Sequence, residues 1–281
     1  MLKAVIRKPL LFAVMGSPIA HSLSPEIYQA FAEQVDIILR YKKLDVDKNA
    51  LAHSIANFRF QGGLGVSITA PLKESMFLEA QMLTNRARDA HAVNNVMFTA
   101  EGIIGDNTDG IGFVRDLIQN QITIRDQKVL ILGAGGAVRG ILRILLGLSP
   151  RKLVLVNRIR YKALALSEYF KSSGKVWVST YESLKRKQFD VVIHGTSAGL
   201  LNELPPLPDE IFLKRAQCYD LNYHKAAKPF LTWARRHGAV KMVDGLGMLV
   251  EQAAETFYTW NQARPNTKPI LEKLRKKLAA E

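Results

Sequence analysis

Cysteine is almost absent from this chain of 281 residues. Cys218 is the only one, which excludes an internal disulfide and any metal site built from several cysteines. No apolar run approaches the roughly 18 residues that a membrane-spanning helix requires. The first ten residues are too short and too interrupted by charge for a secretory signal. The histidines show no paired spacing typical of metal ligands. We therefore expect a cytoplasmic protein with no metal and no membrane association.

Acidic residues are also few relative to basic ones. The 39 Lys and Arg outnumber the 25 Asp and Glu, giving a net charge of +14. A nucleic-acid surface, solvated helix faces and a field that attracts anionic ligands would each produce such an excess. The basic clusters at residues 185–187 and 275–277 lie in polar, helical-looking stretches. Aromatic residues that could stack on bases are not interleaved with them, so we expect no nucleic-acid partner.

Segments with strand and helix character alternate along the first part of the chain. Ser24 followed by Pro25 is typical of a helix start, with Ser24 as the cap. Alternation of this kind predicts a mostly parallel sheet covered by helices. The expected strands are 11–15, 37–44, 64–68 and the hairpin 96–99 with 103–104, and the expected helices are 25–35, 48–60 and 72–90.

The second part repeats the alternation after a helix at 111–120 and a polar stretch at 121–127. Expected strands are 128–132, 153–156, 176–178, 191–193, 218–221 and 240–243, and expected helices are 161–171, 181–187, 228–237, 247–260 and 269–280. We predict an α/β protein of two domains. Residues 1–120 form a substrate domain, residues 121–247 a Rossmann domain, and residues 248–281 helices that pack back on the first domain.

A glycine-rich segment, residues 133–137, directly follows the apolar strand at 128–132. Such glycines let a strand-to-helix turn bring backbone N–H groups against a pyrophosphate. The next strand ends in Asn157 and Arg158, where a dinucleotide fold usually has an acidic residue that binds ribose. A guanidinium there would instead pair with a 2′-phosphate. The segment therefore predicts NADP as the cofactor.

Polar residues also stand at four turns beside apolar strands. Ser22 and Ser24 could bind a carboxylate, although Ser24 could equally serve as a helix cap. Lys73 stands at the head of a helix, where the helix dipole disfavours its charge unless an acid compensates. Asp109 could supply that acid or cap its own helix. Asn94 offers an amide that both donates and accepts hydrogen bonds.

Seven ordered motifs together resemble the shikimate dehydrogenase family over nearly the whole chain. They are residues 22–25, 69–73, 92–94, 105–110, 133–137, 157–158 and 244–252. The resemblance implies NADPH-dependent reduction of 3-dehydroshikimate to shikimate, on the route to chorismate and the aromatic amino acids. It also implies two domains that face each other across a cleft, with the nicotinamide between them.

The resemblance assigns roles to residues that match the family's motifs. Lys73 and Asp109 would be the catalytic pair. The substrate-binding residues would be Ser22, Ser24, Thr69, Lys73, Asn94, Asp109, Tyr223 and Gln252. The cofactor-binding residues would be Gly133, Ala134, Gly135, Gly136, Ala137, Asn157, Arg158, Lys162, Thr196, Gly245 and Met248. The partners would be the small-molecule substrate and a second copy of the chain at most, so the protein would be a monomer or a homodimer.

Four positions depart from the family's common pattern. Ser67 replaces asparagine, Ile159 replaces threonine, Lys162 replaces arginine, and His194 begins a segment that is commonly Asn-Ala-Thr. None of them introduces an acid that would favour NAD. A quinate and shikimate dehydrogenase of broader specificity and a non-catalytic NADPH-binding regulatory module remain alternatives.

Overall fold

The computed structural model describes residues 8–281, which form two compact units. Residues 1–7, most of the segment considered above as a secretory signal, lie outside the described range. The first unit contains residues up to Thr108 together with Val250–Glu281, and the second is Asp109–Leu249. Helix α5 (Asp109–Gln119) belongs to the second unit, where it packs on helix α6. Within residues 8–281 no helix is both long and apolar enough to cross a membrane.

The first unit is built on a six-stranded sheet in the order β2-β1-β3-β5-β6-β4. Only β5 runs antiparallel to its neighbours, and β5 and β6 form the predicted hairpin. The strands are β1 (Leu10–Gly16), β2 (Leu39–Asp45), β3 (Gly65–Ile68), β4 (Met82–Leu83), β5 (Asn95–Phe98) and β6 (Ile103–Asp106). The helices are α1 (Ser24–Gln34), α2 (Leu51–Phe60), α3 (Lys73–Glu79), α4 (Asn85–Ala90), most of α9 (Leu246–Asn261) and α10 (Lys268–Ala279).

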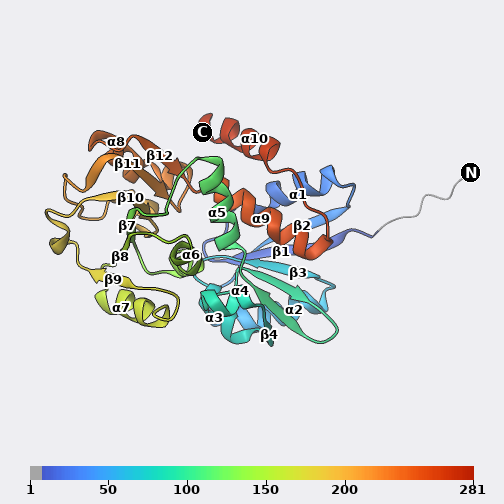
Figure 1. Ribbon diagram of the computed structural model, residues 1–281. Helices are drawn as coiled ribbons and strands as arrows, with labels where there is room; N and C mark the ends of the chain where they lie inside the picture. Colours follow the sequence, from blue (N-terminus) through green and yellow to red (C-terminus); the bar gives the residue numbers. More distant parts are fainter. Residues whose placement is uncertain (1–7) are drawn as a thin grey trace, which may run out of the picture. The chain divides into compact units, whose positions relative to one another are not determined.

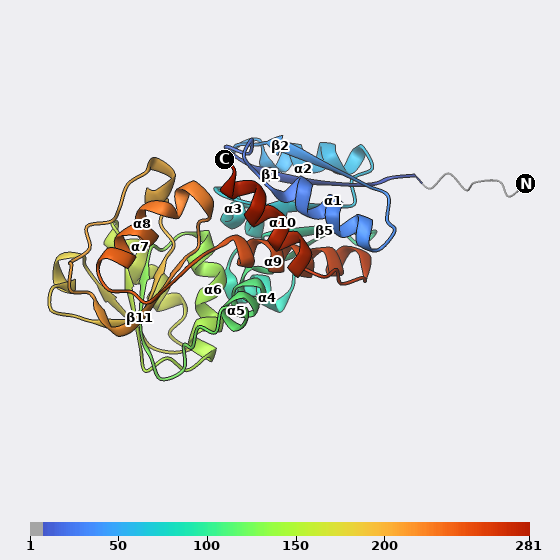
Figure 2. The same cartoon turned by 90° about the horizontal axis from the view of Figure 1, so that it is seen from above.

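Side chains alternate between the two faces of this sheet, and helices cover both. Ala13 and Met15 of β1 face one core, which α2, α3 and α4 cover. Phe12 points the other way and stacks on Trp260 of α9 with ring centroids 4.4 Å apart. The C-terminal helices, red in Figures 1 and 2, therefore lie beside the blue N-terminal elements. An ion pair between Lys277 of α10 and Glu26 of α1 joins the two ends of the unit.

The predicted single helix at 72–90 is wrong. Helix α3 ends at Glu79, and Ala80 has an extended backbone. The N–H of Gln81 donates to the carbonyl of Ile103, and β4 then pairs with β6. Thr84 caps the second helix, α4, by accepting a hydrogen bond from the N–H of Ala87 at 3.2 Å. Tertiary pairing of β4 therefore overrides the helix propensity of the segment.

The second unit contains a six-stranded sheet, all parallel, in the order β12-β11-β10-β7-β8-β9. Its strands are β7 (Lys128–Leu132), β8 (Lys152–Val156), β9 (Val176–Ser179), β10 (Phe189–His194), β11 (Phe212–Asp220) and β12 (Lys241–Asp244). Its α-helices are α5, α6 (Gly136–Gly147), α7 (Arg160–Tyr169), α8 (Lys228–Arg236) and the first turn of α9, with 3₁₀ turns η1 (Glu182–Leu184), η2 (Ala198–Leu201) and η3 (His224–Ala226). The expected helix at 181–187 is thus only one turn.

The strands of this unit are buried on both faces, as parallel strands between helices must be. Val129 and Ile131 face a core closed by α5, α6 and α7, while Leu130 and Leu132 face a core closed by α8. The strand order reverses between β7 and β10. This is the doubly wound arrangement of a dinucleotide-binding domain, in which ligands bind beyond the carboxyl ends of the strands where the order reverses.

Candidate active site

Three of the predicted polar segments of the first unit meet at one edge of its sheet. Strands β1 and β3 are parallel neighbours, so the turns that follow Gly16 and Ile68 lie together. The N–H of Ser17 donates to the carbonyl of Ala70 at 3.2 Å, and the N–H of Thr69 donates to that of Met15 at 2.9 Å. These bonds join the start of the turn that leads from β1 to Ser22 and Ser24 with the turn that carries Thr69.

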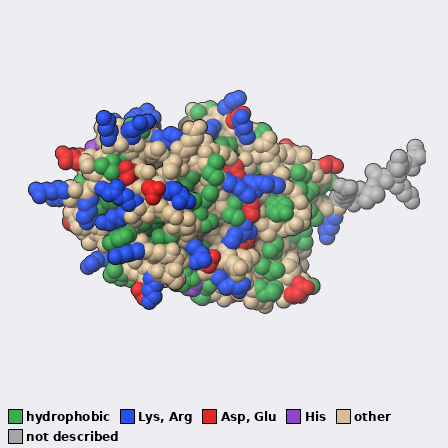
Figure 3. All heavy atoms as spheres, in the orientation of Figure 1, with side chains coloured by type: hydrophobic (Ala, Val, Ile, Leu, Met, Phe, Trp, Pro, Cys, Tyr) green, Lys and Arg blue, Asp and Glu red, His purple; other side chains and the backbone are tan. Residues whose placement is uncertain are grey.

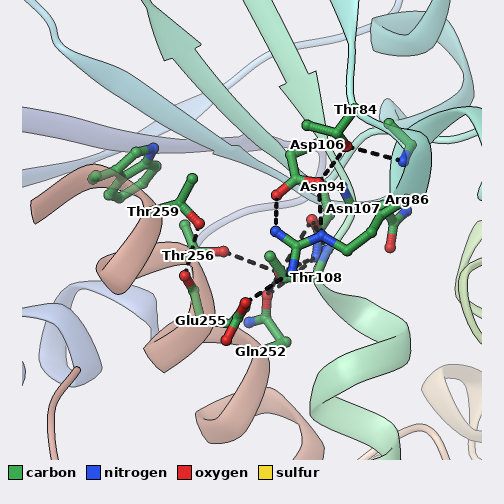
Figure 4. A network of polar contacts seen from close by, with 12 residues as sticks. Thr84, Arg86, Asn94, Asp106, Asn107, Thr108, Gln252, Glu255, Thr256 and Thr259 are labelled. Atoms are coloured by element: carbon green, nitrogen blue, oxygen red, sulfur yellow. Dashed lines mark hydrogen bonds and ion pairs between the residues drawn. The ribbon is translucent and has the colours of Figure 1, made fainter. Parts of the chain in front are cut away.

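Asn94 is held at the same edge, and its backbone carbonyl accepts the N–H of Ile68 at 2.8 Å. Its buried amide donates to Thr108 Oγ1 at 3.0 Å and to Gln252 Oε1 at 3.2 Å, while its Oδ1 accepts the N–H of Thr108 at 2.9 Å. Figure 4 shows these side chains together: Asn94 precedes β5, Thr108 follows β6, and Gln252 comes from α9. Two predicted substrate residues 158 positions apart, Asn94 and Gln252, are therefore in contact.

A charged network supports this cluster, also visible in Figure 4. The Asp106 carboxylate is fully buried and accepts hydrogen bonds from Thr84 Oγ1 at 2.5 Å, from the N–H of Asn107 at 2.8 Å and from two nitrogens of Arg86. Arg86 also pairs with Glu255 of α9 at 2.8 Å. The network fixes the chain just before Thr108 to α4 and to α9. Of these three ion-pair partners only Asp106 lies in one of the sequence motifs, at 105–110, and the sequence predicts no role for Arg86 or Glu255.

Lys73 and Asp109 each begin a helix, as the sequence suggested. Lys73 is the first residue of α3 and is half-buried, while Asp109 is the first residue of α5 and is buried. Lys73 belongs to the first unit and Asp109 to the second. Tyr223 likewise belongs to the second unit, whereas Ser22 and Ser24 belong to the first. The residues predicted as the catalytic pair, and those predicted to bind a carboxylate, are therefore divided between the two units.

Ser24 does not cap its helix. Helix α1 begins at Ser24 itself, no side chain caps it, and Ser22 Oγ accepts the N–H of Ser24 at 3.3 Å. Pro25 stands in the first turn, as predicted. The cap interpretation of Ser24 is therefore wrong.

Ser67, one of the departures from the family pattern, lies between two tyrosines. Tyr41 donates its hydroxyl proton to Ser67 Oγ at 2.8 Å, and the Tyr28 hydroxyl lies 3.2 Å from the same oxygen. The two rings stack with centroids 4.4 Å apart. Burial raises the pKa of both tyrosines well above their usual value, so both hydroxyls stay protonated at neutral pH.

In the second unit, the turn from β7 to α6 has the geometry that a pyrophosphate needs. Gly133 has φ of +111°, and a Cβ there would lie 2.5 Å from the carbonyl oxygen of Gly195. Gly135 precedes α6 with no side-chain cap, and a Cβ on it would meet nothing within 4 Å. The first N–H groups of α6 are thus uncapped beside open space, which suits the phosphates of a dinucleotide.

The turn after β8 carries the residues predicted for the adenosine end. Asn157 Nδ2 donates to the carbonyl of Ile159 at 2.9 Å, which shapes the turn, and Arg158 and Lys162 are exposed. Burial raises the pKa of Tyr181 to about 12 although the nearby Arg158 lowers it. The residues of this unit therefore fit a dinucleotide that carries an additional phosphate.

Gly245 and Met248, predicted on the nicotinamide side, lie where β12 leads into α9. The N–H of Gly245 donates to the carbonyl of Asn222 at 2.8 Å, and a Cβ on Gly245 would lie 2.5 Å from the carbonyl oxygen of Leu221. Met248 is buried in the core of this unit. Only glycine permits this close approach between the ends of β11 and β12.

The described part of the chain was compared with two other kinds of site, a metal centre and a basic surface. Among residues 8–281 no group of three His, Cys, Asp or Glu side chains is placed to hold a metal ion. On the face seen in Figure 3, Lys and Arg side chains are scattered, with Asp and Glu between them. The clusters at 185–187 and 275–277 are exposed, as solvated faces would be.

Comparison with known proteins identifies the family. Residues 14–96 match the shikimate dehydrogenase substrate binding domain, residues 116–201 match shikimate / quinate 5-dehydrogenase, and residues 245–275 match the shikimate 5'-dehydrogenase C-terminal domain. The shikimate dehydrogenase (NADP(+)) of Cellvibrio japonicus is 48% identical over 95% of this chain and 98% of its own length. That of Nitrosospira multiformis is 44% identical over 96% and 98%. The chain belongs to the shikimate dehydrogenase family.

Solved structures that are similar to this chain have the same fold. Thermus thermophilus shikimate 5-dehydrogenase in complex with NADP(H) and shikimate superposes with a TM-score of 0.84 at 30% identity, covering 95% of this chain and 99% of that one. An Ael1 enzyme from Pseudomonas putida superposes with a TM-score of 0.85 at 40% identity, covering 94% and 98%. The α/β fold and the family drawn from the sequence motifs are therefore confirmed.

Proposed function

We propose that this chain catalyses the reversible, NADPH-dependent reduction of 3-dehydroshikimate to shikimate. The proposal rests on one observation, the presence of two features in the same chain. One is the uncapped glycine turn, which Arg158 follows along the chain, and the other is the buried cluster of amide and hydroxyl groups around Asn94. The first suits a phosphorylated dinucleotide and the second suits a ligand rich in hydroxyl groups. The family's relatives carry the same activity in their names.

The proposed roles follow from the chemistry of ketone reduction. NADPH, when bound, supplies the hydride. Negative charge develops on the ketone oxygen as the carbon is reduced, so a cation or a proton donor must stand at that oxygen. We assign this role to Lys73 Nζ, which stabilises the oxygen as an ammonium and then delivers a proton to it. Asp109 favours the charged form of the lysine.

The remaining substrate contacts divide by chemistry. Ser22, Ser24 and Tyr223 hold the carboxylate through hydroxyl donors. Thr69, Asn94 and Gln252 bind ring hydroxyls, for which amides that donate and accept are suited. The cofactor would be held by residues 133–137 at its pyrophosphate, by Asn157, Arg158 and Lys162 at its adenosine end, and by Thr196, Gly245 and Met248 near the nicotinamide.

One experiment tests activity, substrate and cofactor together. Purified protein is mixed with shikimate and either NADP or NAD, and absorbance in the NADPH band is followed. We expect rapid reduction of NADP and much slower reduction of NAD. Quinate in place of shikimate tests the broader specificity that Ser67 leaves open. Binding of NADPH without turnover of either substrate would instead support the regulatory module.

We further propose that the enzyme acts in the cytoplasm as a monomer or a homodimer, without a nucleic-acid partner. The single cysteine, Cys218, is buried and unpaired with another cysteine, which fits a reducing compartment. Light scattering on the purified protein would distinguish the two assembly states.

A further inference from the structure

A histidine at the end of β10 is hydrogen-bonded through both of its ring nitrogens. His194 is fully buried and packs against the ring of Phe230. Its Nδ1 lies 2.9 Å from Oδ2 of Asp220, at the end of the neighbouring strand β11. Its Nε2 lies 2.6 Å from Oγ1 of Thr196. The three side chains form a continuous chain, although the sequence marked only His194 as unusual.

The contacts of Asp220 determine which nitrogen of His194 carries the proton. Asp220 Oδ1 accepts two hydrogen bonds at 2.9 Å, from the backbone N–H and from Nδ2 of Asn222. Asp220 accepts both of these hydrogen bonds, as an ionised carboxylate does, because it has no proton to donate. Its Oδ2 therefore also accepts, from His194 Nδ1–H. The Nε2 of a neutral imidazole is then an acceptor. With His194 in this neutral form, Thr196 donates its hydroxyl proton to Nε2.

This arrangement fixes what Thr196 can offer to a ligand. A hydroxyl has one proton, and here that proton is directed at His194, so the oxygen can only accept from any further group. Its position is held as well, because the backbone carbonyl of Thr196 accepts Nδ2 of Asn222 at 3.1 Å and its Oγ1 accepts the N–H of Ala198 at 3.3 Å. Thr196 thus presents a fixed, half-buried acceptor.

The acceptor stands where a dinucleotide fold binds its ligand. The N–H of Gly195 donates to the carbonyl of Leu132 at 2.8 Å, and the carbonyl of Gly195 lies against Gly133 in the phosphate turn. Thr196 therefore lies next to the glycine turn, at the point where the strand order reverses between β7 and β10.

We propose that Asp220 and His194 are positioning residues that lock Thr196 Oγ1 as the acceptor for the carboxamide N–H of a nicotinamide. The inference rests on the proposed function, because it takes NADPH as the ligand. His194 and Asp220 act through Thr196 and contact no ligand themselves. In a Ser-His-Asp triad, replacing the buried aspartate with asparagine leaves the geometry in place and changes the tautomer of the histidine, and we expect the same of Asp220.

The first test measures binding at equilibrium by titration calorimetry. Thr196→Val removes the acceptor and should raise the Kd for NADPH about three- to tenfold, as the loss of one neutral hydrogen bond does. Binding of 2′,5′-ADP, which lacks the nicotinamide, should not change. Thr196→Ser keeps the hydroxyl and should bind NADPH like the unaltered protein. The acetyl analogue of NADPH, whose carbonyl group carries no N–H, should bind the unaltered protein and Thr196→Val equally.

The second test reverses the direction of the hydrogen bonds that link Asp220, His194 and Thr196, a chain of side chains that we call the relay. In Asp220→Asn the side-chain carbonyl keeps its place by Asn222, while the amide donates to His194 Nδ1 and moves the histidine proton to Nε2. Thr196 then accepts from His194 and turns its own proton toward the ligand. NADPH binding should weaken as in Thr196→Val, and adding Asp220→Asn to Thr196→Val should weaken it no further. Nitrogen NMR of the histidine ring should show the proton on Nδ1 in the unaltered protein and on Nε2 in Asp220→Asn.

The outcomes separate the relay from the proposed function. An equal loss of 2′,5′-ADP and NADPH binding in either variant would mean a structural role and would overturn the relay. Variants that bind NADPH as tightly as the unaltered protein would also overturn it, while shikimate-dependent formation of NADPH would leave the proposed function standing. Failure of the unaltered protein to bind NADPH would overturn both.

Discussion

Replacing Arg86 with methionine should destabilise the first unit more than replacing its partner Asp106 with asparagine. The Asp106 carboxylate is fully buried, whereas the Arg86 side chain is 34% exposed. Arg86→Met therefore leaves a buried charge with only Thr84 and a backbone N–H as partners. Asp106→Asn leaves a guanidinium that still pairs with Glu255 and reaches water.

The magnitudes follow from this asymmetry. Breaking a buried ion pair by removing one partner typically costs about 3–5 kcal/mol. Because water reaches the Arg86 side of the pair, we expect a smaller cost, about 2–3 kcal/mol, for Arg86→Met. Asp106→Asn should cost about 1–2 kcal/mol, the cost of lost hydrogen bonds without an orphaned buried charge. The double variant should be more stable than Arg86→Met alone, because the uncompensated charge is gone.

Urea unfolding followed by circular dichroism gives the free energies, and amide hydrogen exchange along β6 assigns them to the unit that holds the network. Lys171→Met is the matched control, because it removes a lysine whose ion pair with Glu168 is about 70% exposed on both sides. Such a pair contributes roughly 0–1 kcal/mol. The reasoning fails if Arg86→Met lowers the free energy of unfolding no more than the control does. It also fails if the losses caused by Arg86→Met and Asp106→Asn are additive in the double variant. Since Thr108 follows Asp106 closely, kcat/KM should fall with Arg86→Met as well.

Three further predictions concern the site and the core. Lys73→Ala should lower kcat about 100-fold or more with KM much less changed, and an unchanged kcat would remove Lys73 from the mechanism. Arg158→Gln should lower kcat/KM for NADPH about tenfold or more while leaving that for NADH unaltered, and equal efficiency with the two cofactors in the unaltered protein would overturn the preference. The Cys218 thiol, whose pKa is raised by burial and by the charge of Asp220, should not react with a disulfide reagent at pH 8 until the protein unfolds. Counting reacted thiols before and after denaturation checks this, and one fast native thiol would contradict it.

The sequence was informative where a signal is local. Apolar runs followed by glycine or by polar turns located the strands and the dinucleotide turn, because a parallel strand is buried on both faces and reads as continuous apolar sequence. The failure at residues 72–90 has the opposite cause. The helix is interrupted because the N–H of Gln81 donates to the carbonyl of Ile103 and β4 pairs with β6. No pattern in residues 72–90 themselves predicts this contact with β6.

The same distinction applies to the candidate site. Asn94 and Gln252 each stand in a short motif, so resemblance could find them. Their contact, both direct and through Thr108, joins the residue before β5 to helix α9, and no local signal predicts it. Arg86 carried no signal at all, because one arginine on a short helix is ordinary surface sequence. Only the fold brings it against a buried carboxylate.

The two most visible departures from the family pattern acquire a physical account once their neighbours are known. Serine at position 67 is short, and the volume beside it is occupied by the stacked rings of Tyr28 and Tyr41, whose hydroxyls both meet its oxygen. Histidine at position 194 has two ring nitrogens, and both are hydrogen-bonded. Nδ1 bonds to Asp220 at the end of the neighbouring strand, and Nε2 bonds to the Thr196 hydroxyl. In each case the replacing residue forms hydrogen bonds with at least one side chain from another strand or helix. A departure in a motif is therefore a reason to look for new partners across the sheet before inferring that a function has been lost.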